Sequence, residues 1–209
     1  RIALLARGLA FADIDPKKNF AYIDLEEDLQ VPSLEEAARA FGIRIIRSMH
    51  AMNGPETNIL EQVKKLRRTK DEIAKIAFMP RNLSDVTRLF REAKSCTSEE
   101  YILIAMGEYG MPSRILSPMI GSSICYVSSE EAIRTSQNPL GHLDPITIND
   151  VYNVRKIGEG TRIFGVTGSP LTATSSPLIH NRSYHLQNLN AVYIPVKSDT
   201  IEESIEFAE

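Results

Sequence analysis

Residues 71–80 read DEIAKIAFMP, and in this stretch a lysine interrupts an otherwise apolar run. A short apolar run that ends at a proline is typical of a strand buried in a parallel sheet. Lys75 stands inside that run, where its ammonium has to lose water. Two interpretations are open: the nitrogen reaches water while its stem lies on apolar surface, or burial disfavours the charged form and leaves a nucleophilic amine.

Apolar runs of this kind recur along the first part of the chain, and stretches with helix signals separate them. A Ser or Thr followed three residues later by Glu or Asp, the spacing of a capping box, occurs at 33–36, 97–100, 128–131 and 147–150, and Ser84 precedes another candidate helix. Alternation at this short period indicates βα units and a parallel sheet. The runs are FAYIDLE (20–26), IRIIRSMH (43–50), EIAKIAFM (72–79), YILIAMG (101–107) and IGSSICYV (120–127).

Three polar residues lie at or near the C-terminal ends of consecutive runs: Glu26, His50 and Lys75. In a parallel α/β barrel these ends converge on one face, where the active site lies, so we expect the three side chains to surround one pocket. A closed barrel needs eight units. About five strands are expected here, so either the sheet is open or further units precede residue 1.

Each of these residues also has a purely structural interpretation. A lone histidine at a strand end is more often structural, and Glu26 belongs to an acidic run, DLEED, that water can solvate. Placed together, His50 is suited to move protons for the amine, and Glu26 to orient the imidazole. The loop MGEYGMPSR (106–114) adds Arg114, which is either an exposed loop residue or a bidentate ligand for a substrate carboxylate.

The composition excludes several classes of function. The 209 residues carry a net charge of −3 and contain no apolar run long enough to span a bilayer, so neither nucleic acid nor a membrane is an expected partner. Cys96 and Cys125 are too few for a disulfide scaffold or a metal cage, which favours a reducing, cytoplasmic setting without a metal. RIALLARGLA, at the start, has apolar residues at helical spacing, and the last residues open another amphipathic helix. Both ends therefore indicate a piece of a longer polypeptide.

After His142 the pattern changes. A helix candidate at 146–157 runs into GEGT (158–161), and RIFGVTGSP (162–170) is typical of a fresh strand followed by a turn. We then expect a helix from Pro177, a strand at 191–197 and the start of a helix in IEESIEFAE. This order predicts one βαβ unit of a second α/β domain.

The series YIDLE, SMH, KIAFMP, MGEYGMPSR and GSS, in this order and spacing, resembles type I 3-dehydroquinate dehydratase. The resemblance covers residues 1 to about 155. It implies the C-terminal part of a (β/α)8 TIM barrel that dehydrates 3-dehydroquinate to 3-dehydroshikimate through a lysine imine, without metal or cofactor. It assigns the imine to Lys75, proton transfer to His50, orientation of that histidine to Glu26, and substrate binding to Arg114 and Ser122.

Two motifs depart from that family's pattern. The histidine motif, usually S-Y-H-D-F, reads SMHAM, and the closing loop, usually A-P-G-Q, reads PLGH (139–142), so His142 is the candidate donor over the substrate. The family's early strands, which carry further substrate contacts, do not occur in the sequence. We therefore expect the isolated chain to be weakly active or inactive, because unpaired sheet edges and an open core remain.

Residues 164–181, FGVTGSPLTATSSPLIHN, resemble the substrate-binding start of shikimate dehydrogenase, G-x-P-x-x-H-S-x-S-P-x-x-H-N. Ala173 stands at the histidine, Thr174 at the first serine, and Ser176 keeps the second. The resemblance implies that the two hydroxyls bind the carboxylate of shikimate, whereas the residues alone are equally consistent with a turn that caps a helix. The catalytic residues and the NADP loop of that family would lie beyond residue 209.

Together the two segments resemble the bifunctional dehydratase–dehydrogenase of plants and some bacteria, in which the product of the first site is the substrate of the second. This predicts a partial dehydratase barrel at 1–155, a linker at 156–161 and a dehydrogenase segment at 162–209. The compartment implied is the cytoplasm, or the plastid in a plant, and the sequence does not indicate an oligomeric state. Two alternatives stay open: another Schiff-base barrel such as a class I aldolase, or an inactive remnant that serves as a scaffold.

Overall fold

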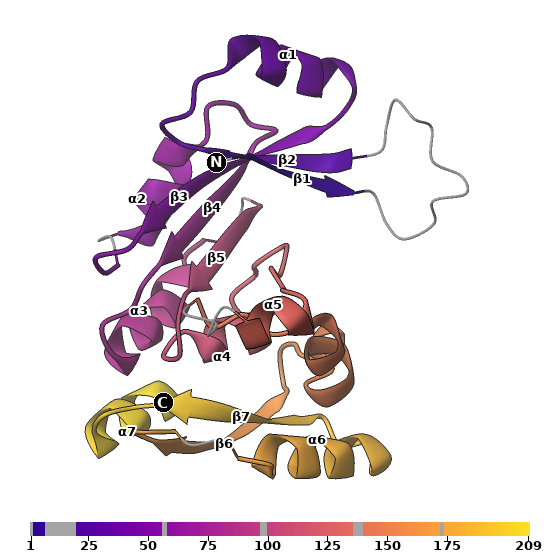
Figure 1. The fold of residues 1–209 in the computed structure, drawn as a ribbon. Helices are drawn as coiled ribbons and strands as arrows, with labels where there is room; N and C mark the ends of the chain where they lie inside the picture. Colours follow the sequence, from indigo (N-terminus) through magenta and orange to yellow (C-terminus); the bar gives the residue numbers. More distant parts are fainter. Residues whose placement is uncertain (1, 7–19, 56–57, 97–99, 136–139, 172–173) are drawn as a thin grey trace.

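The computed structural model describes residues 2–6, 20–55, 58–96, 100–135, 140–171 and 174–209. Seven strands form two sheets in these segments, one in the order β1-β2-β3-β4-β5 and one of β6 and β7 (Figure 1). The elements are β1 (Ile2–Ala6), β2 (Phe20–Glu26), α1 (Pro32–Ala40), β3 (Arg44–Ala51), α2 (Ile59–Leu66), β4 (Ile73–Phe78), α3 (Leu83–Ala93), β5 (Tyr101–Ala105), α4 (Met111–Ile115), α5 (Glu130–Thr135), a π-helical turn η3 (Thr147–Val151), a 3-10 turn η4 (Val154–Lys156), β6 (Arg162–Gly168), α6 (Ser176–Leu186), β7 (Ala191–Lys197) and α7 (Ile201–Ala208).

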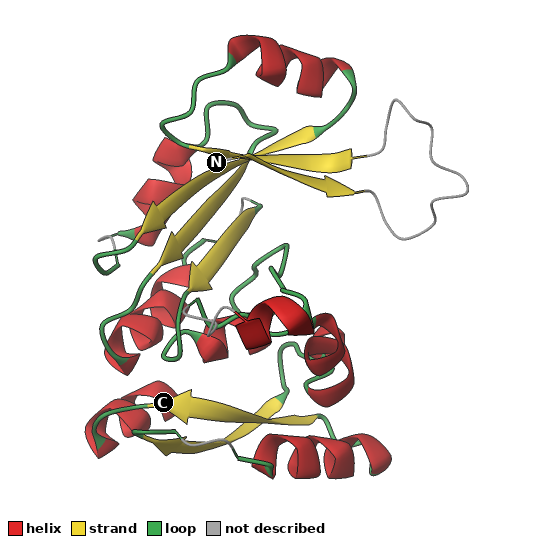
Figure 2. Ribbon diagram, in the orientation of Figure 1, coloured by secondary structure: helices red, strands yellow, loops and turns green. Residues whose placement is uncertain are grey.

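Strands β2 to β5 pair in parallel, each with the next along the chain, and a helix follows β2, β3 and β4 (Figure 2). Four of the five expected apolar runs therefore form the expected βα units. The fold is α/β with parallel sheets. None of the helices in the described segments is long and apolar enough to cross a membrane.

Two segments differ from expectation. Ile2–Ala6, at the chain's start, is a strand that pairs antiparallel with β2 instead of a helix, because a short apolar run cannot distinguish the two by period alone. Residues 120–127 contain no strand and make a single bridge, between Tyr101 and Ser122. Serine hydroxyls replace the ladder there: the Ser122 hydroxyl accepts from the backbone N–H of Leu103 at 3.1 Å, and that of Ser123 donates to the Tyr101 carbonyl at 2.9 Å.

Helix starts also differ in detail from the capping boxes. Helix α1 begins at Pro32, one residue before Ser33, and has no side-chain cap. Helix α3 is capped by Asn82 rather than Ser84, because the amide oxygen accepts a backbone N–H three residues on. The box expected at 97–100 lies partly outside the described residues.

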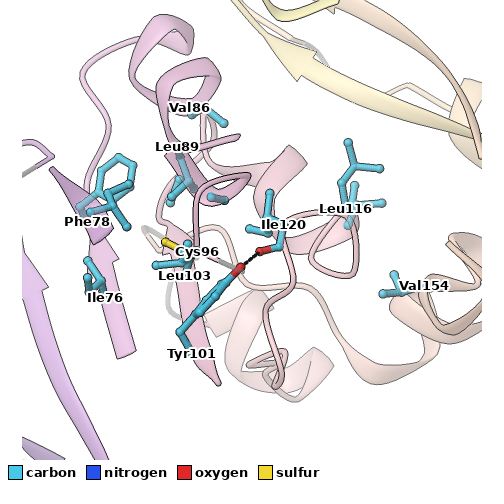
Figure 3. Packing of buried hydrophobic residues seen from close by; sticks show 14 of the residues in the cluster. Ile76, Phe78, Val86, Leu89, Cys96, Tyr101, Leu103, Leu116, Ile120 and Val154 are labelled. Atoms are coloured by element: carbon cyan, nitrogen blue, oxygen red, sulfur yellow. Dashed lines mark hydrogen bonds between the residues drawn. The ribbon is translucent and has the colours of Figure 1, made fainter. Parts of the chain in front are cut away.

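The two faces of the β2–β5 sheet have different partners. One face packs against helices α2, α3 and α4 and contributes to the large apolar cluster shown in Figure 3. Within this cluster the Tyr101 hydroxyl donates to the Ile120 carbonyl at 2.9 Å. The opposite face carries a smaller apolar cluster of Ile46, Ile73, Ala77, Ile102, Ile104 and Met106. Side chains alternate along a strand, so Ser48, His50 and Lys75 share this second face.

The βαβ unit expected after residue 162 is present as β6, α6 and parallel β7, followed by α7. It lies beneath α3 and α4 in Figure 1. Helix α7 packs on α3 through an edge-on contact of Phe90 and Phe207, with ring centroids 5.6 Å apart, and an ion pair of Arg91 and Glu206 at 2.8 Å. The two sheets therefore share a core within one body, and the linker at 156–161 stays a prediction.

Candidate active site

Strand register brings the three predicted catalytic residues to neighbouring positions on one sheet face. Glu26 on β2 pairs with Ser48 on β3, and Ser48 pairs with Lys75 on β4. His50 lies two residues after Ser48 on β3, so it faces the same side of the sheet, and it pairs with Ala77 on β4. The three residues thus occupy adjoining strands on one sheet face, with Glu26 and His50 near the C-terminal strand ends and Lys75 near the middle of β4.

His50 and Glu26 form a direct pair. The imidazole Nδ1 lies 2.9 Å from Glu26 Oε1 and 3.0 Å from Oε2, and each side chain is about one-fifth exposed. A carboxylate at Nδ1 favours the tautomer with the proton on that nitrogen, which leaves Nε2 with its lone pair. The pair therefore presents an oriented base to the space above the sheet.

Lys75 is buried, and two residues that the sequence reasoning missed surround its nitrogen. The Nζ atom donates to Asp24 Oδ2 at 2.7 Å, and it lies 4.0 Å from the centroid of the Tyr126 ring. The Tyr126 hydroxyl donates to the same Asp24 oxygen at 2.8 Å. One of the two open interpretations relied on burial of the amine, but the structure pairs the buried nitrogen with a carboxylate.

The pKa of Asp24 reflects the same contacts. Burial raises the pKa of this carboxyl, but the charge of Lys75 together with hydrogen bonds from Lys75, Ser48 and Tyr126 outweighs it, so the pKa lies below its ordinary value of 3.8. Asp24 is therefore ionised at neutral pH. Its position two residues before Glu26 on one strand was a usable signal, because residues i and i+2 face the same side.

Arg114, on α4, is 3% exposed, so the alternative of an exposed loop arginine is wrong. Its guanidinium donates to the backbone carbonyls of Tyr126 at 3.2 Å and Leu140 at 2.8 Å. Burial lowers its pKa to about 10. Within the described segments it has no salt bridge, so a buried positive charge rests on neutral carbonyls and is suited to bind an anion.

Ser122 and His142 come from the segments that follow β5. The Ser122 hydroxyl accepts from the backbone N–H of Leu103 and so holds β5, and its predicted role in substrate binding stays a prediction. His142 follows Gly141, whose backbone lies so close to the Gly107 carbonyl that an added Cβ would be 2.3 Å from its oxygen. Leu140, which precedes Gly141, accepts a hydrogen bond from Arg114 through its backbone carbonyl. The closing segment thus lies against the arginine's loop.

Thr174 and Ser176 lie at the start of α6, in the second unit. Their hydroxyls are 3.0 Å apart, and Thr174 lines a cavity of about 370 Å³ with Lys197 and Glu108. Ala173 lies outside the described residues. No group of three or more His, Cys, Asp or Glu that could hold a metal occurs in the part of the chain that the structure describes.

Fold and site together define an α/β protein with a candidate lysine-based active site at the carboxyl ends of parallel strands. The sequence matches the profile of "Type I 3-dehydroquinase" over residues 3–159. The chain belongs to the type I 3-dehydroquinase family.

Its relatives include bifunctional proteins. The chain is 29% identical over 160 residues to the "Bifunctional 3-dehydroquinate dehydratase/shikimate dehydrogenase, chloroplastic" of Arabidopsis thaliana, an alignment that covers 75% of this chain and 26% of the relative. It is 29% identical over 203 residues to the "Shikimate biosynthesis protein AroDE" of Chlamydia pneumoniae, which covers 95% of this chain and 39% of the relative. The chain thus spans well under half the length of these two curated relatives.

Solved structures of the family are similar in fold. The 3-dehydroquinate dehydratase of Aquifex aeolicus VF5 superposes with a TM-score of 0.52 at 28% identity, which covers 67% of this chain and 61% of that one. The enzyme of Geobacillus kaustophilus gives a TM-score of 0.53 at 19% identity, covering 65% and 53%, and so supports the fold alone.

Proposed function

We propose that this chain carries a 3-dehydroquinate dehydratase site in which Lys75 forms an imine with the substrate ketone. The observation that carries the proposal is the buried Lys75 on the sheet face that also holds a glutamate-bound His50. Membership of the type I 3-dehydroquinase family supports the substrate and the reaction class.

The chemistry follows from the two nitrogen groups. The deprotonated Lys75 amine adds to the ketone carbon, the oxygen leaves as water, and a cationic iminium results. His50 Nε2 removes a proton from the adjacent carbon, and the electron pair neutralises the nitrogen as an enamine. The enamine expels the β-hydroxyl, which takes a proton from His50 and leaves as water. Hydrolysis of the remaining iminium releases the enone and restores the amine.

Other residues hold the substrate. Arg114 binds the carboxylate, because its buried guanidinium has no anionic partner within the described segments. His142 donates a hydrogen bond over the substrate, since its segment lies against the Arg114 loop. Ser122 supports the site indirectly by holding β5. The dehydratase step needs no metal or cofactor.

We further infer that the chain divides into a dehydratase part at 1–155, a linker at 156–161 and a dehydrogenase part at 162–209. Thr174 and Ser176 would bind the carboxylate of 3-dehydroshikimate or shikimate, and NADP would bind outside this chain. The bifunctional relatives support this division. The compartment proposed is the cytoplasm, or the plastid in a plant, as the name of the Arabidopsis relative states for that protein.

Borohydride trapping tests the imine. The chain is incubated with 3-dehydroquinate and sodium borohydride, and peptides are analysed by mass spectrometry. A reduced adduct on Lys75 is expected, absent in Lys75→Met and retained in the control Lys64→Met. Attachment of the adduct to another lysine, or an adduct that persists in Lys75→Met, would contradict the proposal.

A further inference from the structure

We propose that Asp24 and Tyr126 form a counter-ion unit for the reacting nitrogen of Lys75, in which Asp24 balances its charge and Tyr126 positions both groups. The assignment rests on the proposed function, which makes this nitrogen the reacting atom. Neither residue was singled out by the sequence, and both contact the amine directly.

One carboxylate oxygen holds the unit together. Asp24 Oδ2 accepts from Lys75 Nζ at 2.7 Å and from the Tyr126 hydroxyl at 2.8 Å. The Tyr126 ring also covers Nζ, with its centroid 4.0 Å away, which adds a cation–π contact. Carboxylate and ring therefore occupy two sides of the amine, and a carbonyl has to approach from a remaining side.

The second donor matters when the lysine reacts. The nitrogen is positive as an ammonium and again as an iminium, and Asp24, 5% exposed, is close enough to balance both states. When the amine is neutral or turns toward a substrate, Asp24 loses the Lys75 donor, and a buried carboxylate that loses its charged partner is costly. The Tyr126 hydroxyl keeps one hydrogen bond on the same oxygen throughout.

The other carboxylate at these strand ends is paired, and the charged group nearest to Tyr126 from outside the sheet is the Arg114 guanidinium, which donates to the Tyr126 carbonyl. Glu26 from β2 binds His50 from β3, and the neighbouring positions of β5, Ile102 and Ile104, are apolar. Within the described residues, Asp24 is the carboxylate that forms the recorded ion pair with Lys75. A change at Asp24 should therefore alter the reactivity of the amine more than a change at any other residue of these strand ends.

Reductive methylation reads this reactivity without 3-dehydroquinate. The free amine adds to formaldehyde, water leaves, and hydride from cyanoborohydride reduces the iminium to a methylamine. Mass spectrometry measures the rate at Lys75 relative to Lys64, on α2, as an internal reference between pH 6 and 10. The full chain is used, and circular dichroism checks that each variant is folded.

Asp24→Asn removes the negative charge, so the ammonium loses its stabilisation. An amine that no longer donates to a carboxylate is freer to attack formaldehyde, so methylation at pH 7 should accelerate at least about tenfold, the factor expected from loss of one charge-assisted hydrogen bond. Tyr126→Phe keeps the ring but leaves Asp24 to bind the ammonium alone, so methylation should slow about two- to fivefold. The matched control Tyr22→Phe, on the same sheet face, should leave the rate unchanged.

An unchanged or slower methylation rate at Lys75 in Asp24→Asn would contradict the proposed counter-ion unit. An unchanged or faster rate in Tyr126→Phe would contradict it as well. If Asp24→Asn does not fold, Tyr126→Phe against Tyr22→Phe decides alone. The result is separable from the proposed function, because failure of 3-dehydroquinate to form an adduct leaves the methylation rates readable.

Discussion

A buried ion network behind the candidate site gives a stability prediction that does not depend on activity. Arg47 lies on β3, on the face opposite Ser48 and His50, and is 0% exposed. Its Nη2 atom lies 3.0 Å from Glu72 Oε1 and 3.2 Å from Glu35 Oε1. Glu72 immediately precedes β4, and Glu35 belongs to α1. The network therefore ties together the elements that carry the site.

Replacing Arg47 with methionine leaves two buried carboxylates short of a partner. Removing one partner of a buried pair costs about 3–5 kcal/mol. Arg68, 3.0 Å from Glu35, and Arg39, 3.6 Å from Glu72, compensate in part, and both are more exposed. The substitution also removes the Arg47 Nε group, which is buried without a hydrogen bond, and this offsets the loss of stability by roughly 1 kcal/mol. We expect a net loss of about 2–4 kcal/mol, a large part of a typical domain's stability.

Urea unfolding measures this loss. The chain has 0 tryptophans, so far-ultraviolet circular dichroism is the suitable signal. The double variant Arg47→Met/Glu72→Gln should regain at least about 1 kcal/mol over Arg47→Met, because one orphaned carboxylate is gone. Arg88→Met, which removes a more exposed arginine 3.7 Å from its acidic partners, is the control and should cost less than about 1 kcal/mol. A loss below about 1 kcal/mol for Arg47→Met would refute the reasoning.

Arg114 and Tyr109 give two further predictions. Arg114→Lys keeps the charge but loses the planar fork, so KM for 3-dehydroquinate should rise about tenfold in steady-state kinetics with little change in kcat; a fall in kcat alone would count against carboxylate binding. The hydrogen bond from Tyr109 to Asp199 raises the pKa of Tyr109 to about 12. Its stabilising effect should thus be complete below pH 10 and lost as pH rises through about 12, whereas Asp199→Asn should return the phenolate absorbance step toward pH 10; an unmoved step would exclude this contact in solution.

Most of the sheet was predictable because its strands are short, apolar and bounded by turn signals. Strands β2 to β5 fall within or close to the expected runs. The run at 120–127 failed because Gly121, with φ +68°, and two serines turn the backbone away from regular pairing. Hydrophobicity alone carries no information on such side-chain-to-backbone bonds, which compete with a ladder.

The site was predictable where it follows strand periodicity. Glu26, His50 and Lys75 could be placed together because the ends of parallel strands converge. Asp24 was missed because it is the first residue of an acidic run, DLEED, that suggests solvent exposure, although its strand position buries it. Tyr126 is separated from its partner Asp24 by 102 positions, so only the folded chain brings them together.

Tyr126 also links the two halves of the proposed chemistry. Its carbonyl accepts from Arg114, its hydroxyl donates to Asp24, and its ring covers Lys75. Tyr126 therefore contacts both the Arg114 guanidinium, which we propose binds an anion, and Lys75 Nζ, which we propose forms the imine. A regular strand would commit that carbonyl to a neighbouring strand, so the irregular backbone after Gly121 is what leaves it available to Arg114. The segment that departs most from the expected fold is thus the one that joins the residue proposed to bind the carboxylate to the residue proposed to bind the ketone.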